Sequence, residues 1–272
     1  YTKMDAAWNF INKIWNASRY VIMNLGDMPA PVLPEKSKWD LADRWILSRL
    51  NATVKQVNAQ FEKFEFGEAG RALYNFIWND FCDWYIEMTK EKLNNGTAEE
   101  QANTKNILGY VLDQILKLMH PIMPFVTEKL WQSMPHDGKS IMVAKYPVAH
   151  DEFDDDAATE QMSHLIELIT AVRNIRNQAN APMSKPVDLI IKVENDHLAE
   201  TFKANKDYID RFCHPEKLII GTDVETPKLA LSGILTGAEV DIPMAELVDL
   251  YEERARMKKE IANLEKEVQR SA

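Results

Sequence analysis

The first amphipathic segment of the chain has a polar and aromatic face with the composition of a site for single-stranded RNA. At about 100° per residue, Asn9, Lys13, Asn16 and Tyr20 fall on the side away from the segment's apolar residues. An aromatic ring can stack on a base, amides can pair with base edges, and a lysine can contact phosphate. The alternative is that Tyr20 packs on a neighbouring helix and the asparagines are simply solvated. Face geometry alone favours this packing role, because aromatic residues are usually packing residues.

The stretch "NDFCDWYIEMTK" at residues 79–90 has aromatic or aliphatic residues on almost every side. The helical wheel predicts a core stripe made of Leu73, Ile77, Phe81, Trp84 and Met88. The opposite side carries Asn75, Asn79, Cys82, Ile86 and Lys90. Asn79, Ile86 and Lys90 would then be available to a ligand. A central helix that is buried on all sides is the competing interpretation.

No residue pattern in the chain predicts a metal site or a catalytic site. Cys82 and Cys213 lack C-x-x-C spacing and are expected to be ordinary thiols, and the six histidines show no ligand spacing with them. The acidic run at residues 154–156 lacks the glycine and glutamate of a calcium loop and is expected to be solvated. His120, which precedes a proline, is expected to be a helix-end residue.

Composition sets the size and class of the molecule. The chain has 272 residues, of which 46% are apolar, so two domains are expected. No apolar run approaches the ~18 residues of a membrane span, and we therefore expect a cytoplasmic protein. The net charge of −10 argues against nonspecific nucleic-acid binding by the molecule as a whole. Because the chain starts without methionine and stops inside a periodic helix, we expect it to be part of a longer protein.

Helical periodicity predicts that residues 1–148 form an antiparallel helical bundle. The expected helices are 2–25, one that is capped at Ser37 or Asp40 and ends near Gly67, 68–93, 104–119 and 125–134, with "NNGTAEE" from Asn94 as a turn. Prolines at 121 and 124 are expected to break the chain between the last two. The predicted core stripes of the first two helices are Trp8, Ile11, Trp15, Ile22 and Leu25, with Ser18 in one slot, and Leu47, Leu50, Val54, Val57, Phe61 and Phe64.

The character of the sequence changes after residue 140. "SIMVAKYP" at 140–147 predicts a short strand, and the acidic stretch that follows it predicts a domain boundary. Residues 149–245 are expected to form a small α+β domain, with helices at 162–178 and 198–211 and apolar β-type runs at 187–193, 218–220, 229–235 and 238–243. Residues 246–272 keep a heptad spacing with dense charge, which is typical of the start of a coiled coil.

Five segments, taken in order, resemble the valyl-tRNA synthetases. These segments are "NFINKIWNASRYV", "LADRWILSRL", "FCDWYIEMTK", "HPIMPFVTEKLW" and "SIMVAKYP". The proline-broken segment is similar to all the large class I synthetases for valine, isoleucine and leucine, whereas "FCDWYIE" after "LADRWILSRL" points to the valine family. The resemblance covers essentially the whole chain.

The resemblance implies that the first domain binds the anticodon of tRNA(Val) and that the heptads begin the family's coiled coil. Tyr20 and Ile86 match anticodon-contacting positions, an aromatic and an aliphatic residue that hold splayed bases. Our own geometric extension adds Lys13, Asn16, Arg19, Asn79 and Lys90 to this RNA-binding set. A monomer without a membrane partner is expected.

The family's catalytic signatures, a "HIGH"-like motif and "KMSKS", do not occur in this sequence. "APMSKP" at 181–186 matches three letters of the second motif, but prolines flank them, so we interpret it as a connector. The resemblance implies that ATP, the cofactor of valine activation, is bound outside this chain, which itself would hold no cofactor. The alternatives are a helical scaffold for protein interaction, or the equivalent region of an isoleucyl- or leucyl-tRNA synthetase.

Overall fold

The computed structural model describes residues 2–247 and 261, and the chain divides into two compact units. Unit 1 spans Tyr1–Thr159 and unit 2 spans Glu160–Ala272. The predicted fold class is confirmed: unit 1 is a helical bundle, and unit 2 combines helices with a small sheet.

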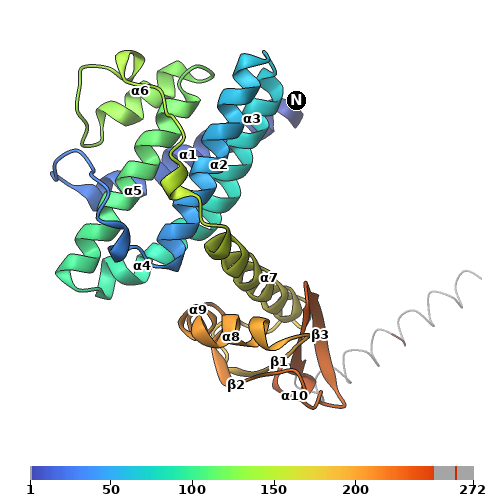
Figure 1. Ribbon diagram of the computed structural model, residues 1–272. Coiled ribbons are helices and arrows are strands. Elements are labelled where there is room, and N and C mark those ends of the chain that lie inside the picture. The colour runs from blue at the N-terminus through green and yellow to red at the C-terminus, as the bar shows by residue number, and fades with distance from the viewer. Residues whose placement is uncertain (1, 248–260, 262–272) are drawn as a thin grey trace, which may run out of the picture. The chain divides into compact units, whose positions relative to one another are not determined.

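Unit 1 is built from six α-helices and a π-helical segment (Figure 1). They are α1 (Thr2–Leu25), α2 (Leu41–Glu62), α3 (Phe66–Asn75), η2 (Phe76–Tyr85), α4 (Ile86–Asn95), α5 (Ala98–Met119) and α6 (Pro124–Gln132). The bundle core is aliphatic and aromatic along α2, η2 and α5. Burial of these stripes is what stabilises helices of this length.

Two capping boxes set where α2 and α5 begin. The Asp40 side chain accepts from the Asp43 amide, and the Asp43 side chain accepts from the Asp40 amide. Thr97 and Glu100 repeat this reciprocal arrangement at α5. The helix α5 therefore starts at Ala98 and not at residue 104, because the Thr-x-x-Glu signature satisfies two backbone amides that would otherwise lack an acceptor. The predicted turn from Asn94 ends at this cap.

The stretch at 79–90 lies largely within η2, and the π-helix changes which side chains are buried. Here the helix turns less per residue than an α-helix, so a wheel drawn at 100° per residue loses register. Phe81 and Met88 are buried as predicted, but Trp84 is only half-buried, whereas Phe76 and Tyr85 are fully buried. Side chains on several sides of the segment are therefore covered, but Asn79 and Asp83 are exposed, so the segment is not buried on all sides as the competing interpretation had it.

The predicted core stripe of α1 is wrong for its two tryptophans. Trp8 is 64% exposed and Trp15 is also exposed, whereas Ile14, Ser18 and Val21 are buried together with Leu25. These smaller side chains let α1 approach α5 closely. Gly109 of α5 shows how close the packing is, since a Cβ there would lie 2.4 Å from Pro31 Cγ and 3.2 Å from Leu25 Cδ2.

The segment after α6 is anchored to α2 and not to a sheet. The predicted strand at 140–147 is instead a single 3-10 turn, η3 (Ile141–Val143). The acidic stretch is not merely solvated, because Asn51 Nδ2 donates to the His150 carbonyl at 2.9 Å and to Asp154 Oδ1 at 2.7 Å. Lys55 Nζ lies 2.5 Å from Asp154 Oδ2. These contacts keep the chain with unit 1 through the start of α7 (Asp156–Gln178).

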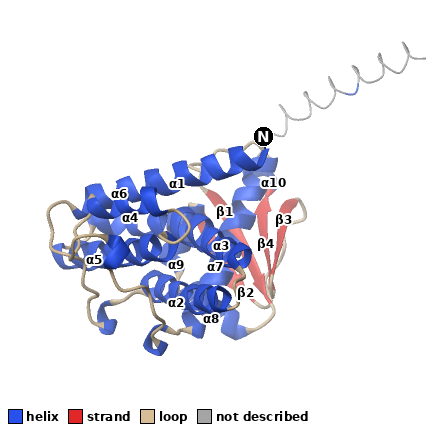
Figure 2. Ribbon diagram, turned by 90° about the horizontal axis from the view of Figure 1, so that it is seen from above, coloured by secondary structure: helices blue, strands red, loops and turns tan. Residues whose placement is uncertain are grey.

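Unit 2 contains a four-stranded mixed sheet of strand order β2-β1-β4-β3, drawn red in Figure 2. The strands are β1 (Val187–Val193), β2 (Pro215–Gly221), β3 (Ala230–Leu235) and β4 (Ala238–Pro243). The parallel pair β1 and β2 is connected through α8 (Asp196–Ala204) and α9 (Lys206–Cys213), and β3 and β4 form a hairpin that turns at Gly237, φ +72°. The single helix predicted at 198–211 is wrong, because Asn205 leaves the helical conformation with ψ 29°.

Arg176, at the end of α7, is fully buried and organises the connection to β1. Its guanidinium donates to the carbonyls of Pro182 (2.9 Å), Lys185 (2.7 Å) and Cys213 (2.8 Å). Two of these acceptors lie in or beside "APMSKP", so that segment is a structural connector between a helix and a strand, as predicted.

The last helix of the continuously described residues is α10 (Met244–Leu247). The predicted coiled coil at 246–272 lies outside the described residues, apart from the last two residues of α10 and the single residue Ile261. None of the helices in the described part of the chain is long and apolar enough to cross a membrane.

Candidate nucleic-acid interface

The two faces singled out in the sequence belong to neighbouring helices of unit 1. α1 contacts η2, and the continuous helix α3–η2–α4 runs beside it. Tyr20 of α1 and Lys90 of α4 come together, with the Lys90 ammonium 5.9 Å from the centroid of the Tyr20 ring. This distance is within the range of a cation–π contact. The structure thus places a half-buried aromatic ring beside a cation that is 40% exposed.

Lys13 is held by two side chains of η2. Its Nζ atom lies 2.6 Å from Asp83 Oδ1 and 3.7 Å from the centroid of the Trp78 ring. Trp78 stacks in turn on Tyr74, with ring centroids 5.4 Å apart. A phosphate would have to compete with Asp83 for Lys13, so this lysine is a less available cation than its position on the helical wheel predicted.

Lys90 is also paired, with Glu87 Oε1 at 2.6 Å one helical turn away. Both side chains remain about two-fifths exposed, and an exposed pair of this kind contributes little to stability. It can therefore rearrange toward an incoming phosphate at small cost. Asn16, Arg19 and Asn79 are all exposed, which agrees with their predicted positions on the ligand side.

Ile86 does not lie where the sequence predicted. It is 6% exposed and belongs to the bundle interior. The π-helical turn that ends at Tyr85 rotates Ile86 away from the solvent side. The prediction of an exposed aliphatic contact at this position is therefore wrong as to its exposure.

A buried polar cluster anchors the junction of η2 and α4 to the start of α2. Tyr85 Oη donates to Asp43 Oδ1 at 2.8 Å, and Lys92 pairs with Asp40 and, at 3.5 Å, with Asp43. Burial and then the Asp40 carboxylate raise the pKa of Asp43 to about 7. Burial opposes ionisation of Asp40 too, but Lys92 lowers the pKa of that carboxyl below its ordinary value. The cluster thus fixes the helix that carries Asn79 and Lys90.

The described residues hold no group of three or more histidine, cysteine, aspartate or glutamate side chains that could bind a metal ion. Both cysteines are free, and burial raises the pKa of the Cys82 and Cys213 thiols to about 12. Neither is activated as a nucleophile. His120 closes α5 as predicted, with Nδ1 2.8 Å from Thr127 Oγ1. The chemistry that this surface offers is stacking, amide pairing and charge.

Sequence reasoning missed the partners of the two lysines. The Glu87–Lys90 pair could have been found from its i, i+3 spacing. Asp83 and Trp78 could not, because they reach Lys13 across about 70 residues of chain.

The matched family is described as "Anticodon-binding domain of tRNA ligase", and its model covers residues 43–191 of this chain. This range is more than half of the 272 residues and includes η2 and α4. α1, which carries Tyr20, precedes it. The match agrees with the resemblance found in the sequence.

Curated relatives extend the similarity to α1. The chain is 70% identical over 253 residues to the valine–tRNA ligase of Lactiplantibacillus plantarum, covering 93% of this chain and 28% of that protein. It is 61% identical to the valine–tRNA ligase of Latilactobacillus sakei (94% and 29% covered) and 55% identical to that of Enterococcus faecalis (99% and 31%). The chain spans less than a third of the length of these relatives.

Proposed function

The chain belongs to the family of anticodon-binding domains of tRNA ligases, and from that premise we propose that it binds the anticodon of tRNA(Val). The proposed interface is the surface where α1 meets η2 and α4. We propose that it acts as part of a monomeric, cytoplasmic valine–tRNA ligase.

The convergence of Tyr20 and Lys90 carries this proposal. These residues come from helices far apart in sequence, and together they offer a ring for a base and a cation for a phosphate. Asn16, Asn79 and Arg19 supply exposed amides and a further charge around them. Lys13 would join only by leaving Asp83, and Ile86 would support the surface from beneath.

In this proposal the chain positions tRNA and performs no bond-making step. Activation of valine with ATP and its transfer to tRNA belong to residues outside 1–272, so no cofactor is bound here.

The test is binding of this chain to a tRNA(Val) transcript and to the same transcript with its middle anticodon base changed, at low and moderate salt. Tyr20→Ala should weaken binding of the native transcript by about 1–3 kcal/mol, or roughly 5- to 150-fold, because one stacked base is lost. Tyr20→Phe keeps the ring and should bind almost as well as the original protein.

Trp8→Ala is the matched control, since Trp8 is an exposed aromatic residue on another flank of the same helix. It should leave the affinity unchanged. The base change and Tyr20→Ala should not add when they are combined, because both remove the same contact. Equal weak binding in every combination would place the anticodon elsewhere on the molecule.

A further inference from the structure

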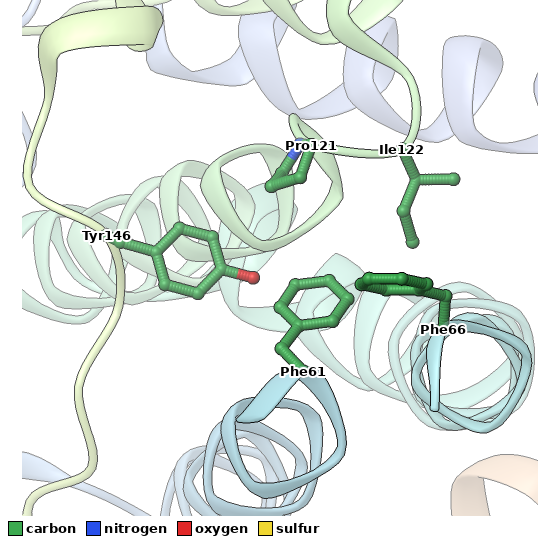
Figure 3. A pocket seen from close by; sticks show the side chains of 5 residues that line it. All are labelled: Phe61, Phe66, Pro121, Ile122 and Tyr146. Atoms are coloured by element: carbon green, nitrogen blue, oxygen red, sulfur yellow. The ribbon is translucent and has the colours of Figure 1, made fainter. Parts of the chain in front are cut away.

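An apolar hollow lies at the corner of unit 1 where α2 turns into α3 and α5 turns into α6. Figure 3 shows its lining, in which Phe61, Phe66, Pro121, Ile122 and Tyr146 surround a cavity of about 630 Å³. The Phe61 ring centroid lies 5.8 Å from that of Phe66 and 6.3 Å from that of Tyr146. The Tyr146 hydroxyl already donates to the Leu118 carbonyl at 3.1 Å. An occupant therefore meets aromatic and aliphatic surface.

Large apolar side chains that are close in the chain to the lining residues of this hollow are exposed. Phe125, three residues after Ile122 at the start of α6, is 89% exposed, and Phe64, in edge contact with Phe66, is 79% exposed. Phe66 itself is 58% exposed. Scattered exposed apolar residues are ordinary in soluble proteins. Several exposed apolar side chains next to an apolar hollow are typical of an interaction surface.

The backbone at Phe64 supports the same conclusion. Phe64 follows the last turn of α2 with φ +60°, in the left-handed region where glycine is the usual residue. A bulky side chain is strained in this conformation. Within unit 1 its ring gains an edge contact with Phe66 and remains mostly in solvent. A contact beyond residues 1–272 would explain why a large apolar ring stands at this position.

The charge of the segment that carries Phe64 and Phe66, and the length of the relatives, favour one kind of occupant. The segment 62–68 carries three glutamates and one lysine, which repels phosphate and disfavours RNA. The curated relatives are more than three times as long as the part that matches this chain. Apolar side chains from that additional polypeptide would meet this corner at high effective concentration.

We propose that this corner, defined by Phe61, Phe64, Phe66, Ile122 and Phe125, is an intramolecular docking surface. It is covered in the complete gene product by an apolar segment from outside residues 1–272. The inference rests on the proposed function, because it takes the chain as part of a longer tRNA ligase. Its consequence is that the bundle is held as a fixed platform for the anticodon and does not swing freely.

Site-specific photo-crosslinking in the complete gene product, without RNA, tests the proposal. A benzophenone amino acid replaces Phe125, whose exposure makes the replacement harmless to folding, and mass spectrometry identifies the joined peptides. The matched control carries the same group at Met23, another exposed apolar position, on the helix that bears Tyr20. We expect an intramolecular crosslink from 125 to a segment outside 1–272, and a much lower yield from 23.

Phe64→Gly provides a second measurement. In residues 1–272 alone it should not lower stability, since glycine accepts φ +60° without strain. In the complete gene product, this substitution should make the segment that connects the bundle to the rest of the polypeptide severalfold more sensitive to limited proteolysis.

The proposal would be overturned by a crosslink to a second copy, by a crosslink to residues 248–272, or by a crosslink yield no higher than that of the Met23 control. Unchanged proteolysis of the Phe64→Gly protein would overturn it as well. Because RNA is absent from both measurements, these failures would leave the anticodon assignment untouched. Loss of that assignment through the Tyr20 variants would in turn leave a positive crosslink standing.

Discussion

The two units bury charged side chains in different ways. In unit 1, Asp40 and Asp43 are balanced by Lys92, with the Tyr85 hydroxyl as an added donor. In unit 2, Arg176 is fully buried, and three backbone carbonyls accept its hydrogen bonds. The first arrangement joins helices through side chains that titrate, and the second joins loops to a helix through groups that do not. Unit 1 should therefore respond to pH at this cluster, whereas the Arg176 arrangement should be insensitive to it.

The largest effect is expected from Arg176→Met, which removes the donor from three backbone carbonyls, one of which belongs to the buried residue Cys213. Unit 2 should lose about 3–5 kcal/mol of unfolding free energy, because the hydrogen bonds to the charged guanidinium are lost and the Cys213 carbonyl is left buried without a donor. Hydrogen exchange of the β1 amides measures this loss.

Arg176→Lys keeps the charge but not the planar fork of the guanidinium. The unfolding free energy of this variant should therefore lie between those of the original protein and of Arg176→Met. Lys203→Met, at an exposed position of α8, is the control and should shift the free energy by less than about 0.5 kcal/mol. A small effect of Arg176→Met would mean that the carbonyls find water and that the two units differ less than their contacts suggest.

A pH effect of intermediate size is expected in unit 1 from Asp43. Its folded pKa of about 7 lies above the ordinary value of 3.8, so between these values the folded state holds a proton that the unfolded state has released. This contribution to the unfolding free energy must fall as pH rises through that window, by at most about 1.4 kcal/mol per pH unit. Asp43→Asn should remove this slope.

All seven tryptophans lie in unit 1, so their fluorescence reports the unfolding of that unit alone. The measurement is urea unfolding between pH 4 and pH 7, taken as the difference between the original protein and the Asn variant. Glu62→Gln, at an exposed carboxylate, should leave the slope as it was. Parallel curves for the original and Asn proteins would show that Asp43 is ionised throughout.

The smallest stability effect is expected at Lys90, whose pair with Glu87 is exposed. Lys90→Met should change the unfolding free energy by less than about 0.5 kcal/mol. The same change should make the salt dependence of tRNA binding less steep by about one counterion, because one phosphate contact is lost. Lys139→Met, in an exposed loop, is the comparison for both readouts. An unchanged salt slope would remove Lys90 from the interface.

Most helices and strands could be predicted because their signals are local. Apolar periodicity, proline breaks and the Asp40 cap identified α1, α2 and α6, and the apolar runs at 187–193 and 238–243 became β1 and β4. The start of α5 was equally readable from Thr97 and Glu100, whose signature was taken for part of a turn. These features depend only on residues close together in the chain.

The errors arose where distant parts of the chain decide the outcome. A wheel of α1 cannot tell whether Trp8 or Ile14 faces the interior of the bundle, because both stripes are apolar. The burial of Ile86 depends on η2, whose π-helical turns no regular period predicts. "SIMVAKYP" has strand composition but no strand beside it to pair with in unit 1 among the described residues, so it forms a 3-10 turn.

The candidate interface was predictable as a set of residues but not as an electrostatic surface. Tyr20 and Lys90 were both found, and their contact agrees with the two predicted faces. Ion pairs engage two of the three predicted cations, Lys13 and Lys90, and one of these pairs depends on a residue about 70 positions away.

The state of the two thiols has a practical consequence for labelling. Because the pKa values of Cys82 and Cys213 are both raised to about 12 by burial, almost no thiolate is present at neutral pH, and maleimide reagents will find these positions slow to react. A cysteine introduced at an exposed position such as Met23 should therefore take up a fluorophore selectively among the thiols of residues 1–272. A dye at that position, on the helix that bears Tyr20, could then report tRNA binding to this chain.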